Sequence, residues 1–273
     1  MSVAREPTAD TLAWSSPTAA AVTTMVQTLP AVDLATLESA AGLLTRVDRK
    51  YIVTLATLER LVQGLGEEWR ALDIDGRRLF GYTSTYFDTD DLVTYRAHLQ
   101  RRRKRYKVRV RRYTESEQCM LEIKRKGLRG VTVKERQPHP AWQQAELGDD
   151  AQRFVTDTLG AYIAQPTSAL RPVVVITNRR ATLASLTSRS RLTIDTDLTC
   201  GWGERILTLR SGHVVLETKV EDHASTVDRM LRSLGERPAP ISKYCVGVAS
   251  LGLDVPHNPW GRTISRYFDN PPT

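Results

Sequence analysis

The stretch RYKVRVRRY, residues 105–113, decides the fold class of this 273-residue chain. Cationic side chains occupy every second position from Arg105 to Arg111, and the positions between them hold Tyr106, Val108 and Val110. Alternation with a period of two is typical of a β-strand that has one polar and one apolar face. The stretch therefore predicts a strand with positive charge along one face.

Two runs downstream repeat this design. QCMLEIKRK (118–126) alternates in the same way, and VTVKER (131–136) follows a turn bracketed by Gly127 and Gly130. Such short connections favour antiparallel pairing of successive strands. Further strands, most with one polar face, are expected near residues 46–53, 69–74, 78–82, 83–88, 171–183, 191–200 and 213–220.

Helices with apolar stripes are expected at 54–65, 149–162 and 224–234, and a short helix follows Asp33. The striped helices need apolar strand faces to cover, which puts them outside the sheet and the charged strand faces inside. The predicted fold class is α+β, with an antiparallel closed β-barrel whose lumen is polar and basic and whose helices pack outside. An open sheet with a solvated polar face is the alternative.

Composition and patterning divide the chain into three parts. Residues 1–31, rich in Ala, Thr, Ser and Pro, are expected to be mostly disordered, 32–252 to form the barrel domain, and 253–273 to be a C-terminal tail. No apolar run is long enough to span a bilayer and no secretory signal is evident, so a cytoplasmic protein is expected. The three cysteines have no CxxC spacing, which predicts neither a disulfide framework nor a thiolate metal site.

The positive charge is concentrated in one segment. The chain has a net charge of +8, whereas residues 96–136 hold 16 Lys and Arg against four Glu, a local balance of +12. A partner that is polyanionic is implied: nucleic acid, anionic lipid or a phosphate chain. The cationic strands lack interleaved exposed aromatic residues for base stacking, which argues against nucleic acid. Residues 101–105 on a loop would still bind any polyanion in a salt-dependent way.

Cations enclosed in a lumen repel one another, by about 2 kcal/mol for a pair roughly 8 Å apart at an effective dielectric near 20. A phosphate chain would relieve that repulsion and accept charge-assisted hydrogen bonds. Glu217 beside Lys219 then suits a ligand for Mg²⁺ or Mn²⁺, with an internal salt bridge as the alternative. The chain has no P-loop or complete GxGxxG motif and no histidine spacing for zinc hydrolysis.

Eight motifs in consistent order, from about residue 32 to 252, resemble the VTC domain. This is the polyphosphate polymerase domain of the vacuolar transporter chaperone complex, within the CYTH-like triphosphate tunnel metalloenzymes. The resemblance implies an antiparallel tunnel in which a divalent metal assists transfer of the γ-phosphoryl of ATP to polyphosphate. The motifs are TRVDRKYIV (45–53), STYFDTDDLVTYRAHLQ (84–100), YKVRVRRY (106–113), LEIKRK (121–126), VTVKER (131–136), RLTIDTDL (191–198), VVLETKV (214–220) and ISKYCVGVASL (241–251).

The resemblance also implies roles for single residues. Catalytic contacts to the phosphates would come from Lys50 of DRKY, Arg109 and Arg111 of KVRVR, and Lys243 of ISKY. Glu217 of LETK would hold the metal, Mn²⁺ or Mg²⁺. Further substrate-binding residues would be Lys124, Lys134, Arg136, Arg179, Arg191, Lys219 and Ser242. Glu122, as a charge partner, is a weaker candidate, and Asp195 is interpreted as structural.

Two other functions remain open at this level. A metal-dependent hydrolase of triphosphates or nucleotides would use the same tunnel, because an acceptor phosphate and water are not distinguished by these motifs. A non-catalytic binder of polyphosphate or nucleic acid would need no metal. Eukaryotic relatives carry an N-terminal SPX domain and transmembrane helices, and since neither is recognised here, a free-standing catalytic domain is expected.

Overall fold

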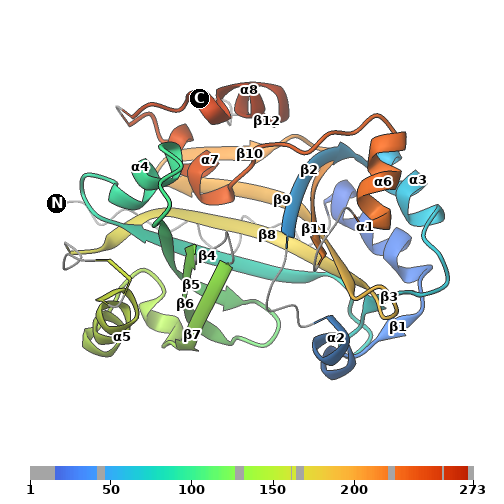
Figure 1. The fold of residues 1–273 in the computed structure, drawn as a ribbon, viewed down its shortest axis with the longest axis horizontal. Coiled ribbons are helices and arrows are strands. Elements are labelled where there is room, and N and C mark those ends of the chain that lie inside the picture. Colours follow the sequence, from blue (N-terminus) through green and yellow to red (C-terminus); the bar gives the residue numbers. More distant parts are fainter. Residues whose placement is uncertain are drawn as a thin grey trace.

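The computed structural model describes residues 16–41, 47–126, 132–160, 162–163, 169–220, 225–253 and 255–269. A 12-stranded sheet lies at its centre, with helices around it (Figure 1). The strands are β1 (Ala31–Val32), β2 (Val47–Thr54), β3 (Trp69–Leu72), β4 (Phe80–Asp88), β5 (Tyr106–Tyr113), β6 (Cys119–Lys126), β7 (Thr132–Pro138), β8 (Arg171–Ser185), β9 (Ser190–Trp202), β10 (Arg205–Leu209), β11 (His213–Val220) and β12 (Phe268–Asp269). The helices are α1 (Pro17–Gln27), α2 (Leu34–Ala41), α3 (Leu55–Gln63), α4 (Val93–Leu99), the 3-10 turn η3 (Ala141–Gln143), α5 (Asp149–Gly160), α6 (Thr226–Ser233), α7 (Lys243–Ser250) and α8 (Asn258–Tyr267).

The long strands β8 and β9 organise the sheet, because each has room for two neighbours along one edge. β8 pairs with β4 and β3, and β9 pairs with β10 and β11. From this pair the sheet extends through β4, β5, β6 and β7 on one side and through β11 and β2 on the other. All pairings are antiparallel except that of β1 with β3. The predicted α+β class with an antiparallel sheet is confirmed.

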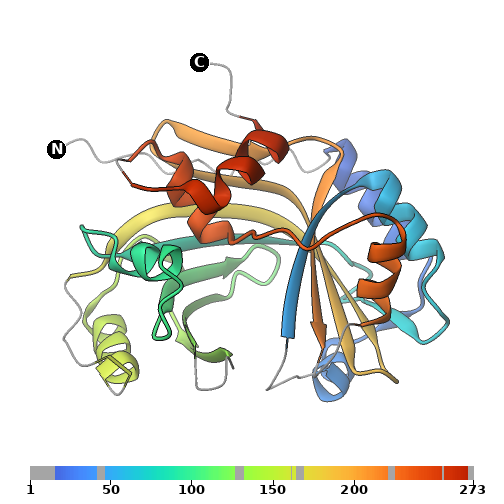
Figure 2. The same cartoon turned by 45° about the horizontal axis from the view of Figure 1, so that its top comes forward.

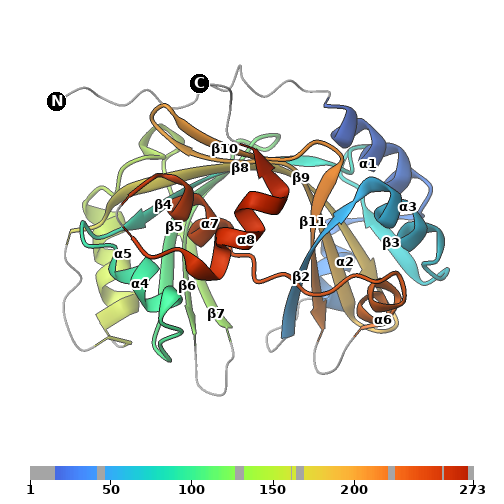
Figure 3. The ribbon, with the colours of Figure 1, turned by 90° about the horizontal axis from the view of Figure 1, so that it is seen from above.

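The sheet curves so that its two halves face each other (Figures 2 and 3), and side chains from both halves line a hollow between them. Within the described residues β2 pairs only with β11 and β7 only with β6, so no ladder joins the two edges. The closed barrel expected from the sequence is thus not observed. Lys50 from β2 and Lys134 from β7 both line the hollow.

Four helices, α1, α3, α5 and α6, cover the outer, convex face of the sheet, the last three as expected from their apolar stripes. α1, α3 and α6 pack with Tyr51, Leu183 and Leu216 in one core, and α5 packs on β5 and β6 in another. Asp228 fixes α6 to this face, since its buried carboxylate accepts hydrogen bonds from Tyr51 and Thr218, both at 2.8 Å. Apolar burial on the convex face therefore leaves the concave face for polar side chains.

Helix α7 packs on the concave face, on the side where Leu34 and Leu37 of α2 also line the cavity. Val174 and Ile176 of β8 share their strand face with Arg180, and they belong to the same core as Cys245 and Val246 of α7. A Cβ added at Gly247 would lie 2.8 Å from Val174, so the helix approaches the sheet closely. The sequence motif at 241–251 predicted no helix inside the sheet. As a result, the N-terminal residues of α7 face the hollow.

The described segments near the two chain ends are more ordered than the sequence predicts. Residues 1–15 lie outside the described residues, but 17–27 form α1, so the expectation of disorder is wrong there. Ser16 caps this helix by accepting a hydrogen bond from Ala19 N at 3.0 Å, and Val22 and Val26 are fully buried. The spacing of these two valines is the weak signal that the composition obscured. In the C-terminal part, α8 and β12 pack onto β10 and the α7 core.

Smaller differences concern element boundaries. The strands expected at 78–82 and 83–88 are one strand, β4, and the short strand β10 was not predicted from the sequence.

Among the helices in the described part of the chain, none combines the length and apolarity that crossing a membrane requires.

Candidate active site

The concave face holds a cavity of about 600 Å³ between the two halves of the sheet. Among the described residues that line it are 14 Lys and Arg against five Asp and Glu, an excess of nine positive charges. They come from β2, β5, β6, β7, β8, β9, β11 and the start of α7. A cavity with this excess favours an anionic ligand with several charges.

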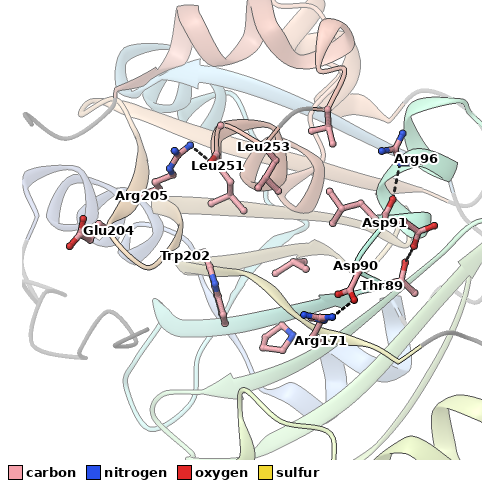
Figure 4. Close-up of a pocket in the computed structure, with 15 residues that line it drawn as sticks. Thr89, Asp90, Asp91, Arg96, Arg171, Trp202, Glu204, Arg205, Leu251 and Leu253 are labelled. Carbon is pink, nitrogen blue, oxygen red and sulfur yellow. Dashed lines mark hydrogen bonds and ion pairs between the residues drawn. The ribbon is translucent and has the colours of Figure 1, made fainter. Parts of the chain in front are cut away.

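A second cavity, of about 720 Å³, lies between α4, the β9–β10 turn and the segment after α7 (Figure 4). Its lining is balanced, with three arginines and three acidic residues. Each arginine is engaged within the wall: Arg171 with Asp90, Arg205 with Leu251 O, and Arg96 with Asp91 O. This cavity offers no excess charge to a polyanion, so the concave cavity is the candidate site.

Three buried carboxylates in the concave cavity are each held by two cationic side chains. The first is Glu122 of β6, whose side chain is fully buried. Arg109 donates to it from Nε at 2.7 Å, and Lys134 approaches from β7. Burial alone would raise the pKa of Glu122, but Arg109, Arg111 and Lys134 hold it well below its usual range. Glu122 is therefore a permanent anion that fixes Arg109.

The second carboxylate is Asp195 of β9. Arg180 donates to both of its oxygens, at 2.6 and 2.8 Å, and Lys243 of α7 lies 2.7 Å from Oδ2. Asn178 also donates to Oδ1 at 3.0 Å. These charges overcome burial and keep the pKa of Asp195 low. Asp195 thus ties α7 to the sheet, which agrees with its interpretation as a structural residue.

The third carboxylate, Glu217 of β11, is held less tightly. Lys50 lies 3.3 Å and Lys219 3.6 Å from its two oxygens, and its side chain is 11% exposed. Burial would raise the pKa of Glu217, but Lys219, Lys50 and Lys124 keep it well below its usual range. Both partners are lysines, which are point charges without the forked geometry of arginine. Glu217 is therefore an anion with oxygens that remain able to take another cation.

Two further cations of the cavity, Arg111 and Lys124, have no carboxylate within salt-bridge distance in the described structure. Arg111 is only 8% exposed; it donates to Ser84 Oγ at 3.1 Å and stacks over the ring of Tyr82. Burial and Arg109 lower its pKa. Burial and Arg109 also lower the pKa of Lys124 well below its usual value. The positive charges of Arg111 and Lys124 are therefore the ones that an anionic ligand would stabilise most.

Two lysines at the site titrate near neutrality. Burial lowers the pKa of Lys243 to about 8, with Arg180 adding to the shift and Asp195 opposing it. Burial likewise lowers the pKa of Lys134 to about 8 against the attraction of Glu122. The charge of the cavity consequently depends on pH around 8.

Eleven of the twelve site residues expected from the sequence line this cavity; Arg179 does not. The side chain of Arg179 points to the convex face and lies 3.9 Å from Asp197, whose other oxygen accepts from Ser16. Its neighbour Arg180 takes the place on the cavity wall. The residues that line the cavity as expected are Lys50, Arg109, Arg111, Lys124, Lys134, Arg136, Arg191, Glu217, Lys219, Ser242 and Lys243.

The sequence does not indicate which of Arg179 and Arg180 faces the cavity, because β8 is buried on both faces. Val174, Val175 and Ile176 are all buried, so no apolar–polar alternation precedes the two arginines. Sequence reasoning also omitted Lys107 from the site residues, although its place in the alternating run signals a cavity position. Lys107 donates to Ser242 Oγ at 2.9 Å and lies over the ring of Tyr244.

A divalent cation such as Mg²⁺ needs oxygen ligands from the cavity wall. No group of three or more His, Cys, Asp or Glu side chains in the described residues is arranged to hold a metal. Glu217 offers carboxylate oxygen, and Mg²⁺ and Mn²⁺ bind through one or two carboxylates completed by phosphate oxygens and water. The residues therefore fit a cation that arrives with a phosphate ligand, held on the protein side by Glu217.

Comparison with known proteins gives the family but little beyond it. No curated protein matches the chain. Similar solved structures include a candidate adenylate cyclase from Bacillus halodurans, 17% identical with a TM-score of 0.47 over 72% of this chain and 94% of that one. A candidate adenylyl cyclase from Hippeastrum with a dominant triphosphatase activity is 15% identical, with a TM-score of 0.48 over 77% and 98% of the two chains.

A third structure, the PH1012 protein of Pyrococcus horikoshii, is 12% identical with a TM-score of 0.41 over 76% and 100% of the two chains. Likenesses at this level add nothing to the functional assignment. The sequence model of the VTC domain, in contrast, matches residues 45–252, which include all eleven expected residues of the cavity wall. The chain belongs to the VTC domain family.

Proposed function

We propose that this chain is a polyphosphate polymerase, which transfers the γ-phosphoryl group of ATP to the end of a polyphosphate chain inside the concave cavity. The observation that carries the proposal is the excess of nine positive charges on the cavity wall. Family membership supports the same assignment. Both substrates are polyphosphates, so one cationic wall serves the donor and the acceptor.

The proposed binding roles follow the charges that are unmet in the structure. Arg111 and Lys124 have no carboxylate partner and take the first phosphate contacts, with Arg109, Lys50 and Lys243 beside them. The remaining wall carries the rest of the chain through Lys134, Arg136, Arg191, Lys219 and Ser242, and Arg180 replaces Arg179 in this set.

In the proposed reaction a terminal phosphate oxygen of the acceptor attacks the γ-phosphorus of ATP. The bond from that phosphorus to the β–γ bridging oxygen breaks, and ADP leaves with the bonding electrons. The attacking oxygen is already anionic, so no general base is needed. This suits a cavity whose three buried carboxylates are all engaged with cations. Positioning and charge neutralisation supply most of the catalysis in phosphoryl transfer.

Glu217 is proposed to hold a divalent cation, Mn²⁺ or Mg²⁺, together with phosphate oxygens. When bound, such a cation neutralises phosphate charge and orients the chain. Lys50 and Lys219 hold Glu217 in its ionised form and point its oxygens into the cavity. The cytoplasmic location expected from the sequence stays a prediction.

The test follows three products together. Purified protein is incubated with ATP and Mn²⁺ or Mg²⁺, with and without a short polyphosphate primer, while ADP, free phosphate and long-chain polyphosphate are measured. ADP that is matched by phosphate in polyphosphate is the expected result. ADP matched by free phosphate would make the protein a triphosphate hydrolase, and no product with either metal would leave a binding protein.

A further inference from the structure

The segment between α4 and β5 carries five consecutive cations, from Arg101 to Arg105. Arg101, Arg102, Arg103 and Lys104 are exposed, whereas Arg105 is half-buried and lines the concave cavity. The roles proposed above use none of the four exposed residues. Positive charge therefore continues from the cavity wall onto the outer surface without a break in the chain.

In the described part of the chain, no carboxylate neutralises the charges of this segment. None of the five side chains forms an ion pair with a carboxylate of a described residue. Side-chain hydrogen bonds of the segment go to neutral oxygens, from Arg102 Nε to Gln100 at 2.7 Å and from Arg105 Nη1 to Arg102 O at 2.6 Å. Four adjacent cations without counter-charges repel one another and attract a polyanion.

The backbone of the segment is held in place, which makes it a surface of defined shape. Arg105 O accepts from Lys126 N at 3.0 Å, and Arg105 N donates to Tyr162 at 2.9 Å. At the other end Arg102 N donates to Ala97 O at 2.9 Å. Arg101 adopts φ of +52°, a left-handed conformation that arginine rarely takes. These contacts anchor both ends of the cationic segment beside the cavity.

We propose that Arg101, Arg102, Arg103 and Lys104 form an outer binding site for the part of a polyphosphate chain that extends beyond the concave cavity. The inference rests on the proposed function for the identity of the chain. A phosphate chain is favoured over nucleic acid because the segment has no aromatic residue for base stacking. Tyr162, which contacts the backbone of Arg105, is engaged through its hydroxyl. The site makes affinity depend on chain length.

The test measures equilibrium binding in EDTA, so that no turnover is needed and the result stands apart from the catalytic assignment. The probes are tripolyphosphate, a medium-chain polyphosphate and a single-stranded oligonucleotide of matched charge. In the test variant Arg101, Arg102, Arg103 and Lys104 are all replaced by Gln. A charge-matched control replaces four exposed arginines elsewhere by Gln: Arg60, Arg232, Arg237 and Arg262.

The wild-type protein is expected to bind the medium chain more tightly than tripolyphosphate, and the test variant to lose that gain while keeping its tripolyphosphate affinity. Unchanged tripolyphosphate binding also shows that the variant is folded. The slope of log K against log salt for the medium chain should fall by about 3, since a single-stranded polyanion releases roughly 0.7 counterions per neutralised charge. The control variant should keep the gain.

Three results would overturn the proposal. If the test variant still prefers the medium chain to tripolyphosphate, the four residues do not contribute to binding of the chain. If the control variant loses the affinity gain for the medium chain equally, the effect comes from net charge and not from this segment. An oligonucleotide that binds the wild type as tightly as the medium chain, and loses as much in the test variant, would make the segment a nucleic-acid site. Failure of the polymerase assay leaves all three readouts measurable.

Discussion

The pattern Leu-Glu-x-Lys occurs twice on the cavity wall, as 121–124 in β6 and as 216–219 in β11, but its two glutamates have different surroundings. Glu122 is fully buried and is bound by Arg109 at 2.7 Å, whereas Glu217 is 11% exposed, with lysines at 3.3 and 3.6 Å. The difference comes from the neighbouring strands, which place Arg109 opposite Glu122 and Lys50 opposite Glu217. Cross-strand partners, more than the local motif, therefore decide which carboxylate is structural and which is available to a metal.

The largest expected effect is on turnover in Glu217→Gln. Loss of this carboxylate removes the proposed metal ligand, and metal ions supply several kcal/mol of charge stabilisation, so polyphosphate synthesis should fall by roughly 100-fold or more. Binding of tripolyphosphate in EDTA should remain, because the cations of the wall are unchanged. Initial rates with saturating Mn²⁺ measure the effect. Full activity in this variant would abolish the contrast between the two glutamates.

Glu122→Gln should instead act on stability. The change leaves Arg109 and Lys134 without their shared anion, and breaking a buried ion pair costs about 3 kcal/mol. For a chain of this size that corresponds to a fall in Tm of roughly 6–12 °C, measurable by calorimetry. Glu217→Gln serves as the matched control, with a smaller expected loss because its lysine partners lie 3.3 and 3.6 Å away. Equal losses of Tm in the two variants would contradict the distinction.

Arg111→Leu extends the comparison to a cation with no carboxylate partner. Loss of a charge-assisted phosphate contact, worth about 1.5–3 kcal/mol, should weaken tripolyphosphate binding by roughly 10-fold to 100-fold. Tm should hold or rise, since repulsion from Arg109 disappears. Titration calorimetry and thermal unfolding measure the two quantities. Arg179→Leu on the convex face is the control, and the placement of Arg179 would be wrong if that variant weakened binding as much.

The smallest expected effect is that of pH. Lys134 and Lys243 have pKa values of about 8 in the folded protein, below the usual lysine value, so they lose their protons between pH 7 and 9. Tripolyphosphate affinity should therefore fall as pH rises through 8, by up to about tenfold per lysine at pH 9. Stability of the free protein should change in the opposite sense and rise from pH 8 toward 10, because the unfolded chain binds more protons there.

Lys243→Arg is the matched variant for this profile. Arginine keeps its charge throughout the range, so the fall in affinity between pH 7 and 9 should become shallower. If the pH profile of affinity is identical in the two proteins, titration of Lys243 does not cause the fall.

Much of this site could be predicted because the alternating sequence of a strand with one polar face indicates which side chains share a surface. The alternation in 105–113 places Arg109 and Arg111 together, and the polar positions of β11 place Glu217 with Lys219. The prediction failed at Arg179 because β8 is buried on both faces and its apolar run hides the parity. Periodicity gives orientation only where the two faces of a strand differ in polarity.

Other features depended on contacts between distant segments. Asp195 binds Lys243 across 48 positions of sequence, and this ion pair helps hold α7 on the concave face. The pairing of β7 with β2, which a closed barrel requires, is absent from the described ladders. Local propensity carries no information on either feature, since both depend on contacts between segments that are far apart in the sequence.

The central claim is that the γ-phosphoryl group passes to a phosphate oxygen and not to water. The most direct test runs the reaction with ATP, Mn²⁺ and a polyphosphate primer in water enriched in oxygen-18, and analyses the phosphorus products by mass spectrometry. The proposed function predicts that the transferred phosphorus appears in polyphosphate without label from the solvent. Free phosphate that carries one solvent-derived oxygen-18 for each ADP formed would contradict it and establish a hydrolase.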